Sequence, residues 1–473
     1  MAVGLSAQTF TTLYSFDAAD GEFPGAALVQ GTDGNLYGTT ANGGPNLGIG
    51  TVFKITPRGE LTTLYTFCPN FPPNCPDGST PAGSLVQAPN GDFYGTTLFG
   101  GAYGGGTIYK ITANGALTTL YSFCQQGVCP NGYGPPVHLT VSLDGDLYGT
   151  TIGGGISSNC TVNNATGCGT IFRITPRGRF TTLFSFCVQS GCPDGSEPTS
   201  LIQAADGEFY GIAAAGGAYG SGTIFKMSPG GSPETVYTFC AQSGCTDGAL
   251  PIGLVQAADG NLFGTTVFGG VIGRGTVFRL TPAGALTTLH SFRCSSALCP
   301  EGRFPNGGLI QGTDGNFYGT TPDGGISGAA GGTIFKITPS GELTTLYNFC
   351  PVACILGGYP QAGLTQGTDG TFYGTASEDG TYKFGSVFSL SAGLGPFVKA
   401  QPASGMMSKA IQILGTKLIG ATSVTFNGAA ATFNVVSSSL ITTSVPAGAT
   451  TGTIQVVTPG GTLSSNVPFH VLP

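Results

Sequence analysis

Tryptophan is absent from this 473-residue chain, and charged side chains account for only 8% of it. No run of 18 apolar residues occurs, and no stretch of ten or more residues has a clear helical period. A membrane-spanning helix needs about 20 consecutive apolar residues, so we expect no transmembrane segment. The formal net charge is −7 and the few basic residues form no patch, which argues against nucleic acid as a partner.

Glycine, in contrast, is very abundant, with 82 residues spaced at regular intervals. The stretches between the glycines are rich in Thr, Val, Ile, Phe and Tyr, which favour β-strands. One phrase, DGNLYGTT at residues 33–40, returns six more times with small changes. Its first glycine falls at Gly34, Gly91, Gly145, Gly207, Gly260, Gly315 and Gly370. Repeat periods near 50 residues are typical of β-propellers and linear arrays.

Each repeat unit contains four short runs with strand composition. In the second unit these runs are Ser84–Gln87, Asp92–Thr97, Gly106–Thr112 and Ala116–Phe123. Seven all-β units of four strands predict a seven-bladed β-propeller, with a linear β-solenoid as the alternative. The chain opens with a fourth-strand phrase at residues 9–16, and its last unit ends on a third-strand phrase. We therefore expect the N-terminal strand to complete the last blade and close the ring, which removes free strand edges.

The connections between the expected strands fall into two groups. Tight turns such as TDGN and TPRG share one face of the blades, and Asp-Gly favours such turns because Gly accepts a positive φ. The long loops share the other face; they are Gly-rich after YGTT and carry cysteine pairs before the next unit. We expect any binding site on this long-loop face, because variable loops on a rigid scaffold usually carry function.

The fourteen cysteines fall into seven close pairs. They are Cys68/Cys75, Cys124/Cys129, Cys160/Cys168, Cys187/Cys192, Cys240/Cys245, Cys294/Cys299 and Cys350/Cys354. An even number of cysteines in local pairs predicts disulfides within each loop and an oxidising compartment. Zinc binding is disfavoured because no histidine accompanies the pairs and CxxC spacing is absent. The start of the chain, MAVGLSAQTF, is too short for a signal peptide, and we interpret GLSAQ as the trimmed end of one.

The composition changes after Leu390. We expect a propeller at residues 8–390, a linker at 391–396 and a second domain at 397–473. The second domain lacks cysteine and the repeated phrase, and it contains alternating runs such as AIQILGTKL, SVTFNG and GTIQVVT. Six or seven short strands over about 80 residues predict a small Ig-like β-sandwich.

Both parts of the chain resemble known families. The repeat, written LVQxxDGNLYGTTxxGGxxGxGTVFKITPxGxLTTLYxF, resembles the GloVer (Gloeobacter/Verrucomicrobia) tandem repeat over residues 8–390. The segment Ile413–Phe469 resembles an IPT/TIG domain, although SGMMSKAIQI lacks a Gly that this family often has before its second strand. The resemblance implies a secreted or cell-surface bacterial protein with a β-propeller and an Ig-like module. It supplies no catalytic motif, so function has to be argued from individual residues.

Residues that recur at one repeat position are interpreted as structural. The aromatic residue of the repeated phrase is expected to pack between blades. A glutamine on the first strand, replaced only at Val141, is expected to hydrogen-bond backbone near the channel. These positions are Tyr37, Tyr94, Tyr148, Tyr210, Phe263, Tyr318 and Tyr373, and Gln30, Gln87, Gln203, Gln256, Gln311 and Gln366.

Five residues that break the repeat are weak candidates for catalysis. His138 replaces a small residue at the start of an innermost strand, which places it near the expected channel. Arg274, Asp323, Glu378 and Asp379 lie in Gly-rich loops where other units have small residues. Neighbouring side chains such as Glu378 and Asp379 point apart on an extended segment and make a poor acid–base pair. Solvated loop residues are the alternative interpretation.

The Gly-rich loops also contain candidate ligand-binding residues, namely Phe99, Tyr103, Tyr219, Phe268, Tyr382 and Lys383. Rings flanked by small residues suit stacking on sugar faces, and packing within the loops is the alternative. The leading hypothesis is a secreted or cell-surface, non-catalytic binding protein whose ligand, a glycan or cell-envelope component, docks on the long-loop face. The alternative is a secreted glycoside hydrolase or polysaccharide lyase with acidic residues at the channel mouth. Nucleotide-binding, zinc and EF-hand motifs are absent, so no cofactor and no metal are expected.

Overall fold

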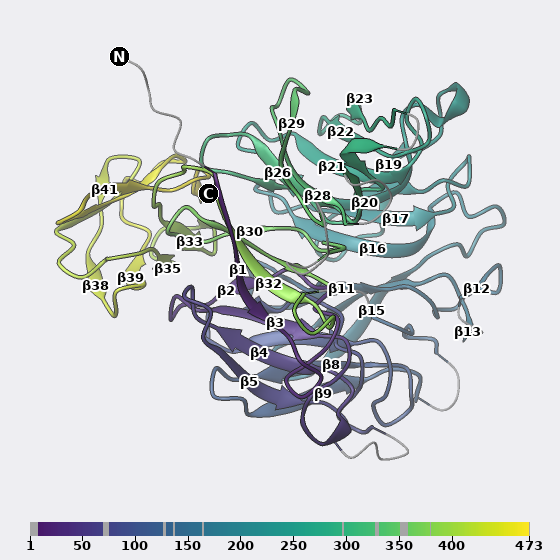
Figure 1. Cartoon of the computed structure of the whole chain (residues 1–473), viewed down its shortest axis with the longest axis horizontal. Coiled ribbons are helices and arrows are strands. Elements are labelled where there is room, and N and C mark those ends of the chain that lie inside the picture. The colour runs from purple at the N-terminus through teal and green to yellow at the C-terminus, as the bar shows by residue number, and fades with distance from the viewer. Residues whose placement is uncertain are drawn as a thin grey trace.

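The computed structural model describes residues 8–69, 75–125, 129–135, 138–162, 165–295, 298–326, 331–350, 358–378 and 380–472. Within these ranges the regular elements are almost all β-strands, with single turns of 3-10 helix at Pro45–Leu47 and Ser243–Cys245 (Figure 1). This confirms the all-β composition expected from the sequence. In the described part of the chain, no helix is long and apolar enough to cross a membrane.

Between Thr9 and Ser391 the described residues form seven antiparallel sheets of four strands, which we call repeat sheets 1 to 7. Sheets 1 to 3 are β2 (Val29–Gln30), β3 (Leu36–Thr40), β4 (Thr51–Ile55), β5 (Leu61–Thr66); β6 (Val86–Gln87), β7 (Phe93–Thr97), β8 (Thr107–Ile111), β9 (Leu117–Ser122); and β10 (Thr140–Val141), β11 (Leu147–Thr151), β14 (Thr170–Ile174), β15 (Phe180–Ser185). Sheets 4 and 5 are β16 (Ser196–Gln203), β17 (Phe209–Ala215), β18 (Thr223–Met227), β19 (Glu234–Thr238); and β20 (Ala249–Gln256), β21 (Leu262–Phe268), β22 (Thr276–Leu280), β23 (Leu286–Ser291). Sheets 6 and 7 are β25 (Ile310–Gln311), β26 (Phe317–Thr321), β28 (Thr333–Ile337), β29 (Leu343–Asn348); and β30 (Thr365–Gln366), β31 (Phe372–Ala376), β32 (Ser386–Ser391) with β1 (Thr9–Ser15).

The aromatic residue of the repeated phrase packs between neighbouring sheets, as expected. Tyr37 is 1% exposed, and its ring stacks on Phe93 of the next sheet with centroids 4.1 Å apart. Phe263 and Phe317 repeat this contact at 4.0 Å. The aromatic pairs therefore bury apolar surface between sheets that would otherwise be separate.

The two threonines that end the repeated phrase hold strands together. Thr39 Oγ1 donates a hydrogen bond to Gly83 O of the following sheet at 3.0 Å. Thr40 Oγ1 lies 2.9 Å from Thr51 Oγ1, within its own sheet. Both side chains are buried, and buried hydroxyls need such partners. The repeated phrase is therefore part of the structural frame.

The two ends of the repeat region lie side by side (Figure 1). Strand β1 pairs antiparallel with β32, so the first and last segments share repeat sheet 7. Thr375 Oγ1 of sheet 7 also donates to Ala26 O before sheet 1, at 3.0 Å. Sheet 7 therefore contacts sheet 1 as one sheet contacts the next elsewhere along the chain.

The residues after Phe397 form a second unit, which we call the tail domain. One sheet contains β33 (Lys399–Gln401), β35 (Ala410–Leu414), β39 (Leu440–Ser444) and β38 (Phe433–Val435). The other contains β37 (Ala429–Ala430), β36 (Ser423–Phe426), β40 (Ile454–Thr458) and β41 (Gly461–Ser464), and β34 (Ser404–Gly405) pairs with β42 (His470–Val471). Buried Ile413, Val424, Ile441 and Val456 share one apolar core.

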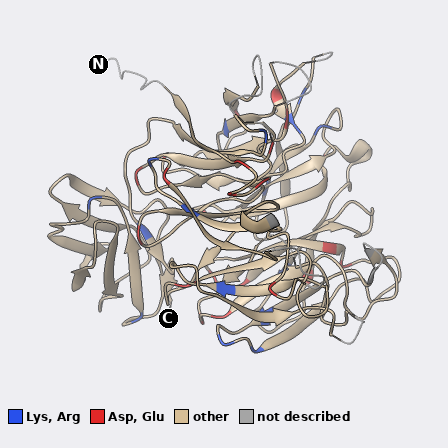
Figure 2. Cartoon of the chain, turned by 60° about the horizontal axis from the view of Figure 1, so that its bottom comes forward, with Lys and Arg blue, Asp and Glu red and all other residues tan. Residues whose placement is uncertain are grey.

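Charged side chains are few and scattered over the ribbon (Figure 2). Several of the basic residues on third strands pair with a carboxylate of the same sheet, as Lys110 does with Asp92 at 3.4 Å. Surface pairs of this kind contribute little stability, so the core contacts dominate.

Candidate functional site

The five candidate aromatic residues of the long-loop face are all solvent-exposed. Phe99, Tyr103, Tyr219, Phe268 and Tyr382 are between 45% and 57% exposed. Scattered exposed apolar residues are common on protein surfaces, so the exposure shows that these rings are accessible to a ligand. Lys383, beside Tyr382, is also exposed.

These rings lie on four different repeat sheets and toward the outer strands. The backbone of Ala102, next to Tyr103, donates to Ser122 Oγ on the fourth strand β9 at 3.3 Å. Burial chiefly, with a smaller contribution from nearby Tyr103, raises the pKa of Tyr121 on the same strand. The aromatic residues thus form a distributed outer rim and are not gathered in one pocket.

Several of the described long loops are anchored by an acidic residue that precedes a glycine. Asp77 Oδ2 accepts hydrogen bonds from Tyr65 Oη at 2.9 Å and from Cys68 N at 3.1 Å. Asp247, which is fully buried, likewise accepts from Tyr237 Oη at 2.8 Å and from Ala241 N at 3.0 Å. We call these contacts acid caps, because a carboxylate satisfies the donors at the end of a fourth strand.

The cap varies among the described repeats: Asn131 takes the place of the carboxylate in one, where its Nδ2 donates to Tyr121 Oη at 2.9 Å, and two further sheets differ at the aromatic position. In one, His290 replaces the tyrosine and Glu301 replaces the aspartate, and their Nε2 and Oε2 atoms are 2.9 Å apart. In the other, Phe184 replaces the tyrosine, and Asp194 Oδ1 is buried without a partner among the described residues. Burial chiefly raises the pKa of Asp194, against two backbone hydrogen bonds that lower it.

Six of the seven predicted disulfides are present within their loops. They are Cys68–Cys75, Cys124–Cys129, Cys160–Cys168, Cys187–Cys192, Cys240–Cys245 and Cys294–Cys299. Cys354, and therefore the seventh predicted pair, lies outside the described residues. The sulphurs of Cys160, Cys168 and Cys187 lie within 4.8 Å of one another, but all three are in disulfides and are not free thiolates for a metal.

A cavity of about 650 Å³ lies where the innermost strands of the repeat sheets meet, and we call it the central cavity. All seven repeats contribute lining residues. His138 and Glu378 are the two titratable residues among the described residues that line it. The structure therefore brings two of the five catalytic candidates to one cavity.

His138 is the one large polar side chain at its repeat position. The other six sheets have Ala27, Ser84, Ser200, Gly253, Gly308 and Gly363 there. His138 keeps surface that is accessible to solvent in the cavity, yet protein surrounds it closely, and this burial lowers its pKa. The imidazole is therefore held neutral, with one nitrogen that donates and one that accepts.

The remaining catalytic candidates lie elsewhere. The guanidinium of Arg274 packs over the ring of Phe304, 5.2 Å from its centroid. Asp323 belongs to β27 (Asp323–Gly325) and sits opposite Arg303 of β24 (Cys299–Arg303). Neither residue lines the central cavity, and Asp379 lies outside the described residues.

On the turn face, the recurring glutamines form hydrogen bonds to the backbone, as expected from the sequence. These bonds connect neighbouring sheets. The side-chain Oε1 of each of these glutamines accepts a hydrogen bond from a backbone N–H of the preceding sheet. The donor residue lies two positions after the glutamine position of that preceding sheet. The bonds join Thr32 to Gln87 (2.9 Å), Leu143 to Gln203 (2.9 Å), Ala205 to Gln256 (2.8 Å), Ala258 to Gln311 (3.2 Å), Thr313 to Gln366 (3.2 Å) and Thr368 to Gln30 (3.0 Å). We call this set the glutamine belt.

The belt has one gap, between sheets 2 and 3. Pro89 occupies the donor position and has no N–H, and Val141 occupies the acceptor position and has no side-chain carbonyl. The two changes match, so no polar group is left unsatisfied by either of them. At this gap Pro89 O accepts a hydrogen bond from Gln412 Nε2 of the tail domain at 3.2 Å.

The tail domain docks on the turn face through equivalent carbonyls of three consecutive sheets. Ser439 Oγ donates to Thr32 O at 2.8 Å, and Phe397 N donates to Thr368 O at 3.0 Å. Thr32, Pro89 and Thr368 hold the same repeat position on sheets 1, 2 and 7. The tail domain therefore contacts the same repeat position on each of these three sheets.

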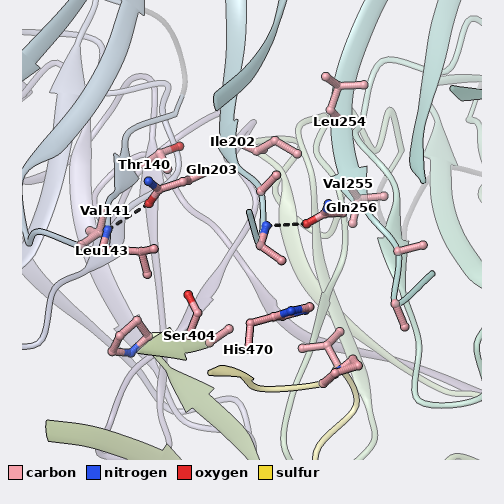
Figure 3. A pocket seen from close by; sticks show the side chains of 18 residues that line it. Thr140, Val141, Leu143, Ile202, Gln203, Leu254, Val255, Gln256, Ser404 and His470 are labelled. Atoms are coloured by element: carbon pink, nitrogen blue, oxygen red, sulfur yellow. Dashed lines mark hydrogen bonds between the residues drawn. The ribbon is translucent and has the colours of Figure 1, made fainter. Parts of the chain in front are cut away.

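Opposite sheets 3 to 5, the tail domain leaves a cleft of about 380 Å³, which we call the interdomain cleft (Figure 3). Leu143, Gln203 and Gln256 line one side, and Ser404 and His470 project from the other. This docking was not predicted from the sequence. Its hydrogen bonds use backbone carbonyl oxygens of Thr32, Pro89 and Thr368, and because every residue has such an oxygen, this repeat position carries no signal for them.

This geometry defines a class of protein, an all-β repeat protein with a propeller-like fold and an appended Ig-like domain. The chain belongs to the Gloeobacter/Verrucomicrobia repeat family, whose model matches residues 1–163, 70–246 and 199–432. The IPT/TIG domain model matches residues 397–471, which confirms the predicted nature of the tail. No curated protein matches the chain in sequence.

Solved structures support the fold. The extracellular domain of a hybrid two-component system from B. thetaiotaomicron is 11% identical with a TM-score of 0.50, covering 96% of this chain and 53% of that one. A second such extracellular domain from the same organism is 12% identical with a TM-score of 0.49, covering 89% and 45%. A PQQ-bound aldose sugar dehydrogenase from Streptomyces coelicolor is 12% identical with a TM-score of 0.40, covering 81% and 98%. The chain thus spans about half the length of the first domain, and at this identity the likeness concerns the fold alone.

Proposed function

We propose that residues 8–390 form a closed seven-bladed β-propeller, joined by a linker at 391–396 to an Ig-like domain at 397–473. The pairing of β1 with β32 supports the closure, as does the belt hydrogen bond from Thr368 N to Gln30 Oε1. Those contacts span more than 330 residues of sequence. The pairing covers one edge each of β1 and β32 that would otherwise be free to pair with another chain.

The protein acts in this proposal as a secreted or cell-surface, non-catalytic binding protein. Six disulfides in short loops favour an oxidising, extracytoplasmic compartment. The extracellular-domain neighbour with a TM-score of 0.50 has the same kind of scaffold. A rigid scaffold with anchored loops suits recognition, because little conformational entropy is lost on binding.

The ligand is a glycan or a glycan-bearing component of the cell envelope, bound along the outer rim of the long-loop face. The observation that carries this proposal is the set of five exposed aromatic residues, which are distributed over four repeat sheets. Aromatic rings stack on the apolar faces of sugar rings, and a distributed rim suits a polymer better than a small molecule. The surface also has little charge, which suits an uncharged polymer.

A glycan-array screen tests this proposal, followed by titration of any bound glycan against the triple variant Tyr103→Ala, Tyr219→Ala and Phe268→Ala. We expect each ring to contribute about 1 kcal/mol, so the triple variant binds at least tenfold more weakly. The matched control is Met406→Ala with Met407→Ala, which removes two exposed apolar side chains of the tail domain. Absence of binding to any glycan, or equal loss in the control, would refute the proposal.

The hydrolase or lyase alternative depends on His138 and Glu378, because Arg274 and Asp323 lie away from the central cavity. An acid and a base must both reach the bond that is cleaved. Release of reducing ends or unsaturated products from a bound glycan, abolished in Glu378→Gln, would favour this alternative over simple binding.

A further inference from the structure

Two of the three histidines of this chain line adjoining spaces along the inner strands. His138 lines the central cavity, and His470 of the tail domain lines the interdomain cleft. Thr140, Ile202 and Leu254 line both spaces, so the two lie next to each other. The third histidine, His290, is occupied by its contact with Glu301 on a fourth strand.

The polar side chains in the central cavity share one chemical property. The hydroxyls of Ser84 and Thr199 and the amides of Asn306 and Gln361 can each donate and accept hydrogen bonds, as a neutral His138 can. Ser84 Oγ and Thr199 Oγ1 are buried and have no partner in the described part of the chain. Because solvent does not reach these two oxygens, the hydrogen-bonding groups offered to a bound molecule are chiefly those of His138, Asn306 and Gln361.

Charge is nearly absent from the same surface. Neither the central cavity nor the interdomain cleft is lined by a described Lys or Arg, and Glu378 is the one described carboxylate. An anion would therefore meet no cation and one negative charge. Leucines from several sheets, among them Leu139, Leu201 and Leu309, supply the apolar remainder of the wall.

We propose that the central cavity and the interdomain cleft together form a second binding site, for a small uncharged polyhydroxylated molecule the size of a monosaccharide or disaccharide. His138 hydrogen-bonds the ligand from the wall, and His470 does so from the floor supplied by the tail domain. Hydroxyl groups match side chains that both donate and accept, and the CH faces of a sugar match the leucines. This site does not include the aromatic residues of the outer rim. Only the choice of a sugar as its ligand rests on the proposed function.

Calorimetric titration of the full chain tests this site with glucose, galactose and cellobiose as probes, and with glucuronate as the anionic counterpart. We expect at least one uncharged sugar to bind and glucuronate to bind more weakly. His138→Ser restores a residue of the repeat, and His470→Ala removes the floor imidazole; each should weaken binding about fivefold to tenfold through a lost hydrogen bond. The control, His290→Tyr, restores the tyrosine of the other repeats and should leave binding unchanged.

Failure of all three uncharged sugars to bind would overturn the site. Binding that His138→Ser weakens but His470→Ala does not would overturn the contribution of the tail domain. The outcome is independent of the rim: a glycan that binds on the array, and loses affinity only in the rim variant, would support the proposed function while refuting this second site.

Discussion

The long-loop face and the turn face of the repeat sheets are stabilised by different kinds of contact. On the long-loop face, each acid cap and disulfide joins residues 5 to 12 positions apart in the sequence. On the turn face, each belt hydrogen bond joins residues of neighbouring repeats, 51 to 60 positions apart or, between the last and first, 338 apart. The loops are thus fixed one repeat at a time, whereas the turns are fixed to each other.

This difference explains at which positions the amino-acid sequence of each face can change. A loop that is anchored within its own repeat can change its tip without disturbing the next repeat, and the exposed rings occupy such tips. A belt position is shared by two repeats, so a change on one side requires a matching change on the other. Pro89 and Val141 are such a matched pair, and the tail domain docks beside them.

The largest expected effect is at a buried acid cap. Asp247→Ala removes a fully buried carboxylate and leaves the donors of Tyr237, Ala241 and Gln242 without an acceptor. We expect the free energy of unfolding to fall by about 3 kcal/mol, measured by denaturant titration. A loss below about 1 kcal/mol would show that the cap does not anchor its loop.

Loss of a disulfide should have a smaller effect on the same face. The double variant Cys187→Ser with Cys192→Ser opens a short loop, and we expect a loss of about 2 kcal/mol from the entropy of the unfolded chain. Non-reducing peptide mapping provides the control that the remaining pairs keep their partners. If variants that remove each of the other disulfides lose the same free energy of unfolding, local pairing is supported. Disulfides between cysteines of different loops would contradict it.

Phe184→Tyr should complete the defective acid cap. Phe184 contacts Phe186 at 5.1 Å between centroids, as Tyr65 contacts Phe67, so a new hydroxyl would lie near Asp194 Oδ2, the oxygen that accepts from Cys187 N. A hydrogen bond to a carboxylate should raise the free energy of unfolding by about 1.5 kcal/mol. The matched control is Phe184→Leu, which offers no donor.

The same variant has a defined pH dependence. Because burial raises the pKa of Asp194 in the folded chain, the folded state holds the proton more tightly than the unfolded state does. The carboxyl therefore reduces stability as pH rises above the ordinary Asp pKa of 3.8. A tyrosine hydroxyl stabilises the ionised form, so the gain from Phe184→Tyr should grow over this pH range; a gain independent of pH would contradict the contact.

The smallest effect concerns the turn face. Val141→Gln alone finds no donor at Pro89, and Pro89→Thr alone finds no acceptor at Val141. The double variant supplies both groups, and we expect a coupling energy of about 1 kcal/mol in a double-mutant cycle of denaturant unfolding. Additive behaviour of the two changes would show that the belt is not a set of pairwise contacts.

Several features of this fold were predictable because they are local or periodic. Three of the four runs expected in the second repeat, such as Asp92–Thr97 for β7, differ from the observed strands by single residues at their ends, whereas the run Ser84–Gln87 begins two residues before β6. Asp-Gly turns, alternating strands and paired cysteines are encoded within a few residues of each other. Comparison of the seven copies of the repeat also distinguished two kinds of position. Some keep one residue type for structural reasons, such as that of Tyr37, and at others one copy differs, such as that of His138.

The candidate site was less predictable for a geometric reason. Arg274, Asp323 and Glu378 occupy similar loops in the sequence, yet only Glu378 reaches the central cavity. Where such a side chain points depends on the neighbouring sheet, as the packing of Arg274 over Phe304 shows. The docking of the tail domain was not predicted either, because its hydrogen bonds go to backbone carbonyl oxygens, which every residue has.

The sequence by itself determined the strands, the turns, the cysteine pairs and the number of copies of the repeated phrase, because each of these depends on contacts within a short segment. Only the tertiary structure decided which of the residues that break the repeat lie near one another. His138 and Glu378 share a cavity although 240 residues separate them, and His470 reaches the adjoining cleft from another domain. The physical reason is that inner strands from all seven sheets converge on one space, where distance along the chain no longer matters.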